Sequence, residues 1–348
     1  MKFIFFSFFL IFTSSVFAQL DTSLTRVIAA DQDAELAYNE GVQKYLGQNL
    51  PGAIDDFNKA VKIRPTFAKA YYNRGIIKSD LHDFEGAVAD YSIVIELDPS
   101  LAKAYFARGF AKVRTTDYQG ALSDLTSAIQ QGYSKANVYY YRGVARFQLN
   151  DLDGSIADFD RAIQEDPNYA YAYHDRGSAK RKKGLLAVAE KDYEKATILN
   201  VKLAFAFNNL GSVRSEMGKY TEAVEAFTRA LVVDAEYYYA YNNRGMAKYN
   251  LKNYEGAIED FKKALNYKNT YYTAYNNLGT AYIKLENYDL ADEAFSKAIE
   301  LNDKYAEAYA NRGHVRELLR NFKGACADWN KAATLGIKNP EVYTDGCK

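Results

Sequence analysis

The chain has 348 residues, and its 44 Lys and Arg residues are balanced by 44 Asp and Glu residues, so its formal net charge is zero. This balance gives no electrostatic case for binding nucleic acid or an anionic membrane surface. A chain of this length ordinarily divides into several compact domains, unless it is a repeat array in which each unit packs only on its neighbours.

The first residues have the pattern of a secretory signal peptide. Lys2 is followed by an apolar run over residues 3–12, and Val16 and Ala18 stand three residues and one residue before the expected cleavage site. We expect residues 1–18 to be removed and the mature chain to be exported, either to the periplasm or to the medium. The alternative is an uncleaved membrane anchor, but the run is too short to span a bilayer comfortably. No later stretch is apolar over the length of a transmembrane helix.

Residues 19–33 form a polar lead-in with no obvious period, which either extends the first helix or stays loose. From Ala34 onward, the chain repeats one pattern with a period of 34 residues. Counting Ala34 as position 1, position 24 is large and apolar, and positions 20 and 27 are Ala in eight of nine blocks. Position 8 is always glycine: Gly41, Gly75, Gly109, Gly143, Gly177, Gly211, Gly245, Gly279 and Gly313.

This period, with these residue types, resembles the tetratricopeptide repeat, or TPR. The resemblance covers residues 34–339 without insertion or deletion, and it implies an all-α fold, a right-handed α-solenoid (superhelix) of nine helix-turn-helix units. The expected units are residues 34–67, 68–101, 102–135, 136–169, 170–203, 204–237, 238–271, 272–305 and 306–339.

Each block is typical of two amphipathic helices, helix A over about positions 1–14 and helix B over about positions 16–30. Glycine inside a helix costs about 1 kcal/mol relative to alanine, so its recurrence at position 8 indicates that helix B approaches closely there. Pro65, Pro99 and Pro167 fall at position 32, where helix B must end. Asn or Asp at position 16 predicts the N-cap of helix B. The predicted caps are Asp83, Asp117, Asp151, Asn253, Asn287 and Asn321.

Two positions of the repeat vary together. Six blocks have Arg at position 7 and Asp at position 23, and the two blocks with Leu at position 7 have Ala at position 23, whereas the first block departs with Glu40 and Asp56. A semi-buried ion pair between helices A and B explains this, because removing one partner is costly while replacing both can be nearly neutral. The predicted pairs are Arg74–Asp90, Arg108–Asp124, Arg142–Asp158, Arg176–Asp192, Arg244–Asp260 and Arg312–Asp328.

Position 11 is basic in eight of the nine blocks, with Tyr282 as the exception. These residues could form a basic stripe for an anionic ligand, or they could pack their stems between repeats while their charged ends reach water or nearby acids. The zero net charge and the many neighbouring Asp and Glu residues favour the second interpretation.

Residues 340–348 are too few for another repeat, and we expect them to cap the end of the last helix pair. The only two cysteines are Cys326, in the last helix B, and Cys347, in this tail. In an exported chain, this arrangement predicts a disulfide bond, which would contribute on the order of 3 kcal/mol. The alternative is two unrelated thiols.

In TPR proteins, helix A faces line a concave groove that holds peptides or partner helices, so the resemblance implies a binding face at positions 2, 5, 6, 9, 12 and 13. An asparagine at position 6 of successive blocks looks like the asparagine ladder in the TPR arm of O-linked GlcNAc transferases, where the amides hold the backbone of an extended peptide. Blocks six to nine match this ladder and blocks three to five depart from it. The position 6 asparagines are Asn39, Asn73, Asn209, Asn243, Asn277 and Asn311.

A carboxamide can pair with a peptide unit without reading its side chain, because it offers both a donor and an acceptor. Tyrosines at groove positions also suit recognition, since each ring has a polar tip. The alternative is that these asparagines only keep the groove hydrated or bond locally. The further candidates on this face are Asn208, Asn242, Asn276, Tyr72, Tyr140, Tyr171 and Tyr239.

Catalytic features are missing from the pattern. The three histidines lie in different blocks, no cysteine joins them at metal-ligand spacing, and the repeated glycines are explained by helix packing. We therefore expect no catalytic residue, no metal and no cofactor, but an interaction scaffold that binds another protein or peptide. The alternatives are a structural spacer or assembly component of the cell envelope, and a glycan-binding protein that uses the groove tyrosines. The pattern leaves the partner and the oligomeric state open.

Overall fold

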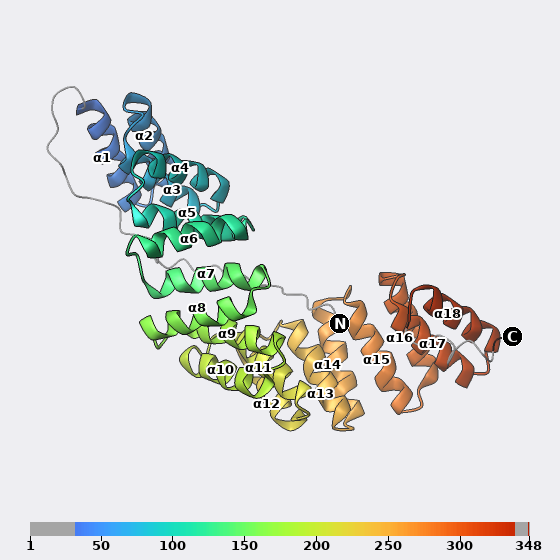
Figure 1. The fold of residues 1–348 in the computed structure, drawn as a ribbon. Helices are drawn as coiled ribbons and strands as arrows, with labels where there is room; N and C mark the ends of the chain where they lie inside the picture. The colour runs from blue at the N-terminus through green and yellow to red at the C-terminus, as the bar shows by residue number, and fades with distance from the viewer. Residues whose placement is uncertain (1–31, 338–346, 348) are drawn as a thin grey trace. The chain divides into compact units, whose positions relative to one another are not determined.

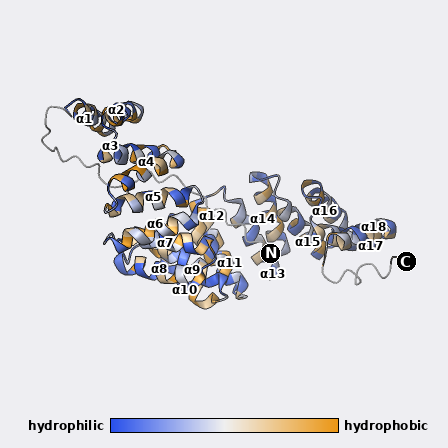
Figure 2. Ribbon diagram, turned by 45° about the horizontal axis from the view of Figure 1, so that its top comes forward, coloured by the Kyte–Doolittle hydropathy of each residue, from blue (hydrophilic) through white to orange (hydrophobic). Residues whose placement is uncertain are grey.

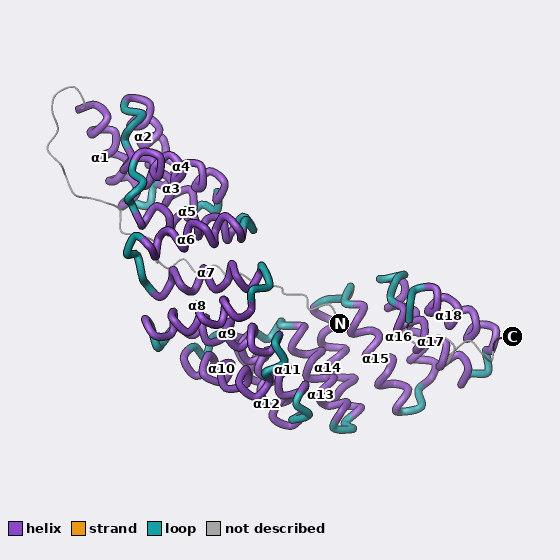
Figure 3. The backbone as a smooth tube through the Cα atoms, viewed as in Figure 1, coloured by secondary structure: helices purple, strands orange, loops and turns teal. Residues whose placement is uncertain are grey.

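The computed structural model describes residues 32–337 and Cys347. Every regular element in this part of the chain is an α-helix, as Figure 3 shows. The expected signal peptide, residues 19–31 of the lead-in and all of the C-terminal cap except Cys347 lie outside the described residues. The first helix begins at Gln32, so the end of the lead-in does extend it.

The helices alternate between the two expected types. Helices A are α1 (Gln32–Leu46), α3 (Ala68–Asp80), α5 (Ala102–Arg114), α7 (Ala136–Gln148), α9 (Ala170–Lys182), α11 (Ala204–Glu216), α13 (Tyr238–Asn250), α15 (Tyr272–Lys284) and α17 (Ala306–Leu318). Helices B are α2 (Leu50–Ile63), α4 (Phe84–Leu97), α6 (Tyr118–Gln130), α8 (Leu152–Glu165), α10 (Leu186–Leu199), α12 (Tyr220–Val233), α14 (Tyr254–Tyr267), α16 (Tyr288–Leu301) and α18 (Phe322–Thr334). The predicted all-α architecture of helix pairs is therefore confirmed.

The chain forms two units, which divide between Glu165 and Asp166. The first unit contains α1–α8 and the second contains α9–α18 (Figure 1). Within each unit, the two helices of a pair pack on each other and helix B packs on helix A of the next pair. Helices A of successive pairs also touch, as α5 and α7 do in the first unit and α11 and α13 in the second. Helices A therefore form a layer of their own in each unit.

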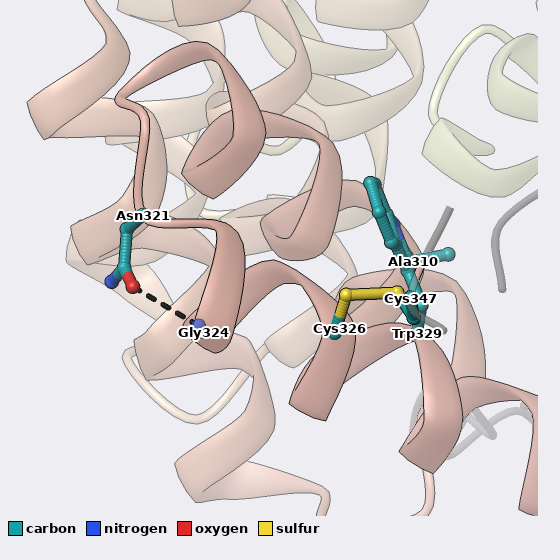
Figure 4. The surroundings of a disulfide bond; sticks show 6 residues. All are labelled: Ala310, Asn321, Gly324, Cys326, Trp329 and Cys347. Atoms are coloured by element: carbon teal, nitrogen blue, oxygen red, sulfur yellow. Dashed lines mark hydrogen bonds between the residues drawn. A yellow bond between two sulfur atoms is a disulfide. The ribbon is translucent and has the colours of Figure 1, made fainter.

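Helix B starts with a side-chain cap in most repeats. The backbone N–H of Gly86 donates to Asp83 Oδ1 at 2.9 Å, and a Cβ on Gly86 would lie only 2.1 Å from Asp83 Oδ2. The cap therefore needs glycine at position 19 as well as Asn or Asp at position 16. Asn287 is the N-cap residue of α16, as predicted, but Leu290 stands at position 19 there and the Asn287 side chain makes no cap bond. The same bond forms at Asn49, Asp83, Asp117, Asp151, Asn253 and, in Figure 4, Asn321.

The core of each pair is built from small residues around one large side chain. Each helix carries both hydrophobic and hydrophilic residues, as the colours of Figure 2 show. The alanines at positions 20 and 27 are fully buried in most repeats, and they bring the helices close together. The side chain at position 24 then fills the space above the position 8 glycine, as Phe261 does above Gly245. The predicted steric role of this glycine is confirmed, because a Cβ on Gly245 would lie 2.6 Å from Phe261 Cε1.

We expect Gly245→Ala to lower the free energy of unfolding by about 2 kcal/mol, because forcing a methyl group against a buried ring exceeds the gain in helix propensity. Gly177→Ala is the matched control at the same position. Its Cβ would lie 3.2 Å from the nearest atoms of Tyr193, so we expect a change within about 1 kcal/mol. Urea unfolding followed by circular dichroism measures both. Equal stability of the two variants would contradict the packing argument.

Candidate functional site

All six Arg–Asp pairs come together across helices A and B of the same repeat. In the second repeat, Arg74 Nε lies 2.9 Å from Asp90 Oδ2 and Arg74 Nη2 lies 2.5 Å from Asp90 Oδ1, so the contact is bidentate. The aspartates are buried, and the arginine side chains are at most 18% exposed. These arginines therefore stabilise the helix pairs, and we do not count them among the candidate ligand-binding residues. The other five pairs have the same geometry: Arg108–Asp124, Arg142–Asp158, Arg176–Asp192, Arg244–Asp260 and Arg312–Asp328.

The basic residue at position 11 binds the same aspartate in these repeats. Lys78 Nζ, for example, lies 2.8 Å from Asp90 Oδ2. In the first repeat, Lys44 and Lys59 bind Asp56, and although burial opposes ionisation, these two cations hold the pKa of Asp56 below its ordinary value. Position 11 therefore consists of structural ion pairs and is not a free basic stripe. The matching contacts join Lys112–Asp124, Arg146–Asp158, Lys180–Asp192, Lys248–Asp260 and Arg316–Asp328.

In the repeats without Asp at position 23, the residue at position 11 lacks this aspartate as a partner within its own repeat. In the sixth repeat, where Leu210 and Ala226 replace the pair, Arg214 turns to Glu190 and Glu194 on the preceding helix B. Arginine at position 7 also reaches the preceding repeat, since Arg244 Nη1 donates to Thr228 Oγ1 at 3.0 Å. These cations therefore link neighbouring repeats, which the sequence pattern did not reveal.

The asparagines at position 6 form a regular series across the second unit. The amide nitrogen of each points at the position 5 side chain of the preceding repeat, so successive helices A are tied together by side-chain hydrogen bonds. The Nδ2 atoms of Asn243, Asn277 and Asn311 donate to the Oδ1 atoms of Asn208, Asn242 and Asn276 at 3.0, 2.9 and 2.9 Å, and Asn209 Nδ2 lies 2.8 Å from His174 Nε2. We refer to these four position 6 residues as the amide series.

Burial separates the two columns of asparagine. Asn208, Asn242 and Asn276 at position 5 are at most 8% exposed, so they present little surface to a partner. The amide series is half-buried, and within the described residues the Oδ1 atoms of Asn277 and Asn311 accept no hydrogen bond. The carboxamides of Asn277 and Asn311 are therefore each held in place by one N–H group while the oxygen stays available, whereas Asn243 Oδ1 accepts from Asn242 Nδ2 at 3.4 Å. The alternative of local bonding is partly right, because local bonds orient the amides.

In the first unit the equivalent bond forms at Asn73, whose Nδ2 donates to Tyr38 Oη, at position 5 of the preceding repeat, at 2.9 Å. Asn73 is fully buried, however, and Asn39 is half-buried on α1. Beyond that, position 6 becomes Ala107 and then Tyr141, whose ring packs on Phe110 with 4.8 Å between centroids. The helix A face of this unit is therefore largely filled by its own aromatic side chains.

The candidate tyrosines are packed rather than free. Tyr72 and Tyr140 contact the position 24 rings Tyr91 and Phe159, and burial raises the pKa of Tyr72. Tyr171 packs on Phe205, and burial with the nearby Asp175 raises its pKa. The hydroxyl groups of Tyr72 and Tyr171 therefore stay protonated at neutral pH.

Tyr239 belongs to a cluster of tyrosines near the junctions between successive repeats of the second unit. Its ring centroid lies 4.2 Å from that of Tyr238 and 5.5 Å from that of Tyr271. Tyr272 and Tyr305 continue the cluster, and burial is the main cause that raises the pKa of Tyr305 to about 12. Sequence reasoning identified only Tyr239 here, although the tyrosines at positions 34 and 1 recur at the repeat period.

Two cavities lie away from the amide series. One of about 530 Å³ lies on the outer side of α1 and α2, and one of about 220 Å³ lies between the start of α16 and Leu319. Over residues 32–337, no cluster of His, Cys, Asp or Glu has the make-up of a metal site, and no helix is long and apolar enough to cross a membrane.

The predicted disulfide joins Cys326 of α18 to Cys347 (Figure 4). In the same repeat, Trp329 takes position 24 and its Nε1 donates to the backbone oxygen of Ala310 at 3.3 Å. The last helix pair is thus held by a covalent bond to the tail and by a buried indole.

Models of the tetratricopeptide repeat match residues 68–101, 106–170, 208–270 and 272–305, and a TPR repeat model matches residues 41–81. Together they cover more than half of the chain. A comparison with curated proteins found no match.

Solved structures share the fold at low sequence identity. The C-terminal part of a TPR repeat-containing protein from Cytophaga hutchinsonii is 19% identical, with a TM-score of 0.58 over 70% of this chain and 99% of that one. A tetratricopeptide repeat protein from Parabacteroides merdae is 16% identical, with a TM-score of 0.56 over 70% and 97%. PilF from Pseudomonas aeruginosa is 17% identical, with a TM-score of 0.53 over 61% and 96%. These similarities concern the fold alone.

Proposed function

Because the chain belongs to the tetratricopeptide repeat family, we propose that it is a non-catalytic scaffold that binds an extended segment of another protein along helices A of its second unit. The observation that carries this proposal is the amide series Asn209, Asn243, Asn277 and Asn311. Its four carboxamides stand at the same position of four successive repeats, and each is oriented by a bond to the preceding repeat.

The chemistry of the amide series favours an extended segment over a helix. The backbone N–H groups of a partner helix are already bonded within that helix, whereas those of an extended segment need acceptors. The free Oδ1 atoms of Asn277 and Asn311 supply such acceptors, one on each of two successive repeats. Because the inter-repeat bonds already restrict these side chains, little conformational entropy is lost when a partner binds.

The position 9 side chains beside the amide series are of mixed polarity: Ser212, Met246, Thr280 and His314. The hydroxyl groups of Ser212 and Thr280 donate to backbone oxygens of their own helices, and His314 Nδ1 lies 3.8 Å from Glu317 Oε2. A face without a dominant charge suits recognition of the partner's backbone more than of its acidic or basic side chains.

The proposed scaffold acts outside the cytoplasm. The disulfide between Cys326 and Cys347 supports this location, because disulfides form and persist in oxidising compartments. The pattern of residues 1–18, which is that of a secretory signal peptide, also supports export.

We expect the triple variant Asn243→Ala, Asn277→Ala and Asn311→Ala to lose the specific partner that the wild-type protein captures from an envelope extract. The matched control replaces Asn208, Asn242 and Asn276 with Ala. Both variants break the same three inter-repeat hydrogen bonds, but only the first removes the half-exposed carboxamides. Quantitative mass spectrometry of the captured proteins compares the two.

Peptides from a captured partner then test backbone recognition. N-methylation of single peptide units should weaken binding at least about tenfold, a loss of roughly 1.4 kcal/mol, while alanine substitution of the same peptide residues should have smaller effects. Equal capture by the two triple variants and the wild type would reject the amide series as the binding site. Retention on cell-wall material without any protein partner would instead favour the glycan alternative.

A further inference from the structure

The outer side of the first helix pair differs from the corresponding side of every later pair. Position 3 of helix A is small and fully buried in repeats two to nine, where it is Ala70, Ala104, Val138, Ala172, Ala206, Ala240, Ala274 and Ala308. In the first repeat it is Leu36, which is 59% exposed. A large apolar side chain thus stands at an otherwise tightly packed position, on a face that no described residue covers.

Leu36 lies at the centre of an open surface between α1 and α2. Ile63 of α2, which is 51% exposed, lines the same cavity of about 530 Å³. Burying these two exposed aliphatic side chains, which lie on adjacent helices, would stabilise a contact made on this surface. We refer to this cavity and its lining residues as the end face.

The charges around the end face are sorted by helix. Its acids, Asp33 and Glu40, come from α1, and its bases, Lys59 and Lys62, come from α2. A second copy of the same surface, related by a two-fold axis through the cavity, would place α1 of one copy over α2 of the other. Acids would then face bases on both sides, so the end face is self-complementary in charge as well as apolar at its centre.

We propose that the end face is the contact between two copies of this chain, in an isologous dimer built on α1 and α2. Leu36 and Ile63 form its apolar centre, and Glu40 of one copy pairs with Lys62 of the other. These two residues are available, since within the described residues neither forms an ion pair, whereas Lys59 is already bound to Asp56 at 3.0 Å. A second copy of this chain supplies the matching separation of acid and base by symmetry.

Light scattering and sedimentation equilibrium of the purified protein test the dimer. The wild type should have twice the mass of one chain, and Leu36→Asp should raise the dissociation constant at least about tenfold, which corresponds to roughly 1.4 kcal/mol. Phe322→Asp is the matched control, because Phe322 of α18 is 61% exposed but lies outside the end face. It should leave the mass unchanged, and circular dichroism should report the same helix content for all variants.

Charge reversal tests the pairing itself. Glu40→Lys and Lys62→Glu should each weaken the dimer, while the two together should restore it, because acid and base are exchanged on both copies. A wild-type protein that stays monomeric at high concentration would overturn the proposal, and so would a dimer that survives Leu36→Asp. Removing residues 19–31 tests whether the lead-in, rather than a second copy, covers the end face. A protein that becomes dimeric only after this deletion would show that the lead-in covers it, and that result would also count against the proposal.

Discussion

Replacing Asp260 with alanine is expected to lower the free energy of unfolding by about 3–5 kcal/mol, because it leaves two cations without their shared buried partner. Asp260 accepts from Arg244 Nε at 2.8 Å and lies 2.8 Å from Lys248 Nζ. Its own exposure is 1%, and the cations are mostly buried too. Arg244→Leu alone should be milder, since Lys248 still neutralises the carboxylate.

The eighth repeat shows which residues can replace this cluster together. It carries Leu278, Tyr282 and Ala294 at positions 7, 11 and 23. We therefore expect the triple variant Arg244→Leu, Lys248→Tyr and Asp260→Ala to recover most of the stability that Asp260→Ala loses. Replacing both sides of a buried ion pair with apolar groups can be nearly neutral, whereas removing one side is not.

Urea unfolding measured by circular dichroism compares these variants. Glu259→Ala is the control, because Glu259 is an exposed acid on the same helix and should change stability by less than about 0.5 kcal/mol. If Asp260→Ala and Glu259→Ala unfolded at the same urea concentration, the buried cluster would not be a source of stability.

Removing the disulfide with Cys326→Ser and Cys347→Ser is expected to destabilise the last helix pair by about 3 kcal/mol. The bond joins residues 21 apart, so it restricts the unfolded chain at the end of the second unit. In a repeat array, each helix pair depends mainly on the pairs that it packs against. The loss should therefore be local to α17 and α18.

Hydrogen exchange locates this effect. The amides of α17 and α18 should exchange faster in the double serine variant, while those of α9 and α10 in the same chain serve as an internal control. A reducing agent should have the same effect on the wild type and none on the variant. Unchanged exchange in α17 and α18 would show that the bond contributes no stability there.

Much of the fold could be predicted from the sequence, because its causes lie within one repeat. The 34-residue period predicts the lengths of helices A and B. The residues at position 8 of helix A and at positions 20 and 24 of helix B determine how the two helices pack, as Gly245 and Phe261 illustrate. The joint variation of Arg and Asp also identified pairs such as Arg244–Asp260, since both residues belong to one helix pair. Asn287 shows the limit of this reasoning, because the cap also needs glycine three residues later.

The tertiary structure decided what happens between repeats. Asn277 bonds to Asn242, 35 residues earlier, and Arg214 bonds to Glu190 on the preceding helix B. A fixed period states which residues are equivalent, but it does not state how far one helix pair is shifted against the next, and side-chain contacts between repeats depend on that shift. For the same physical reason, only packing could separate the buried asparagines of position 5 from the half-exposed ones of position 6, and so place the amide series on the surface.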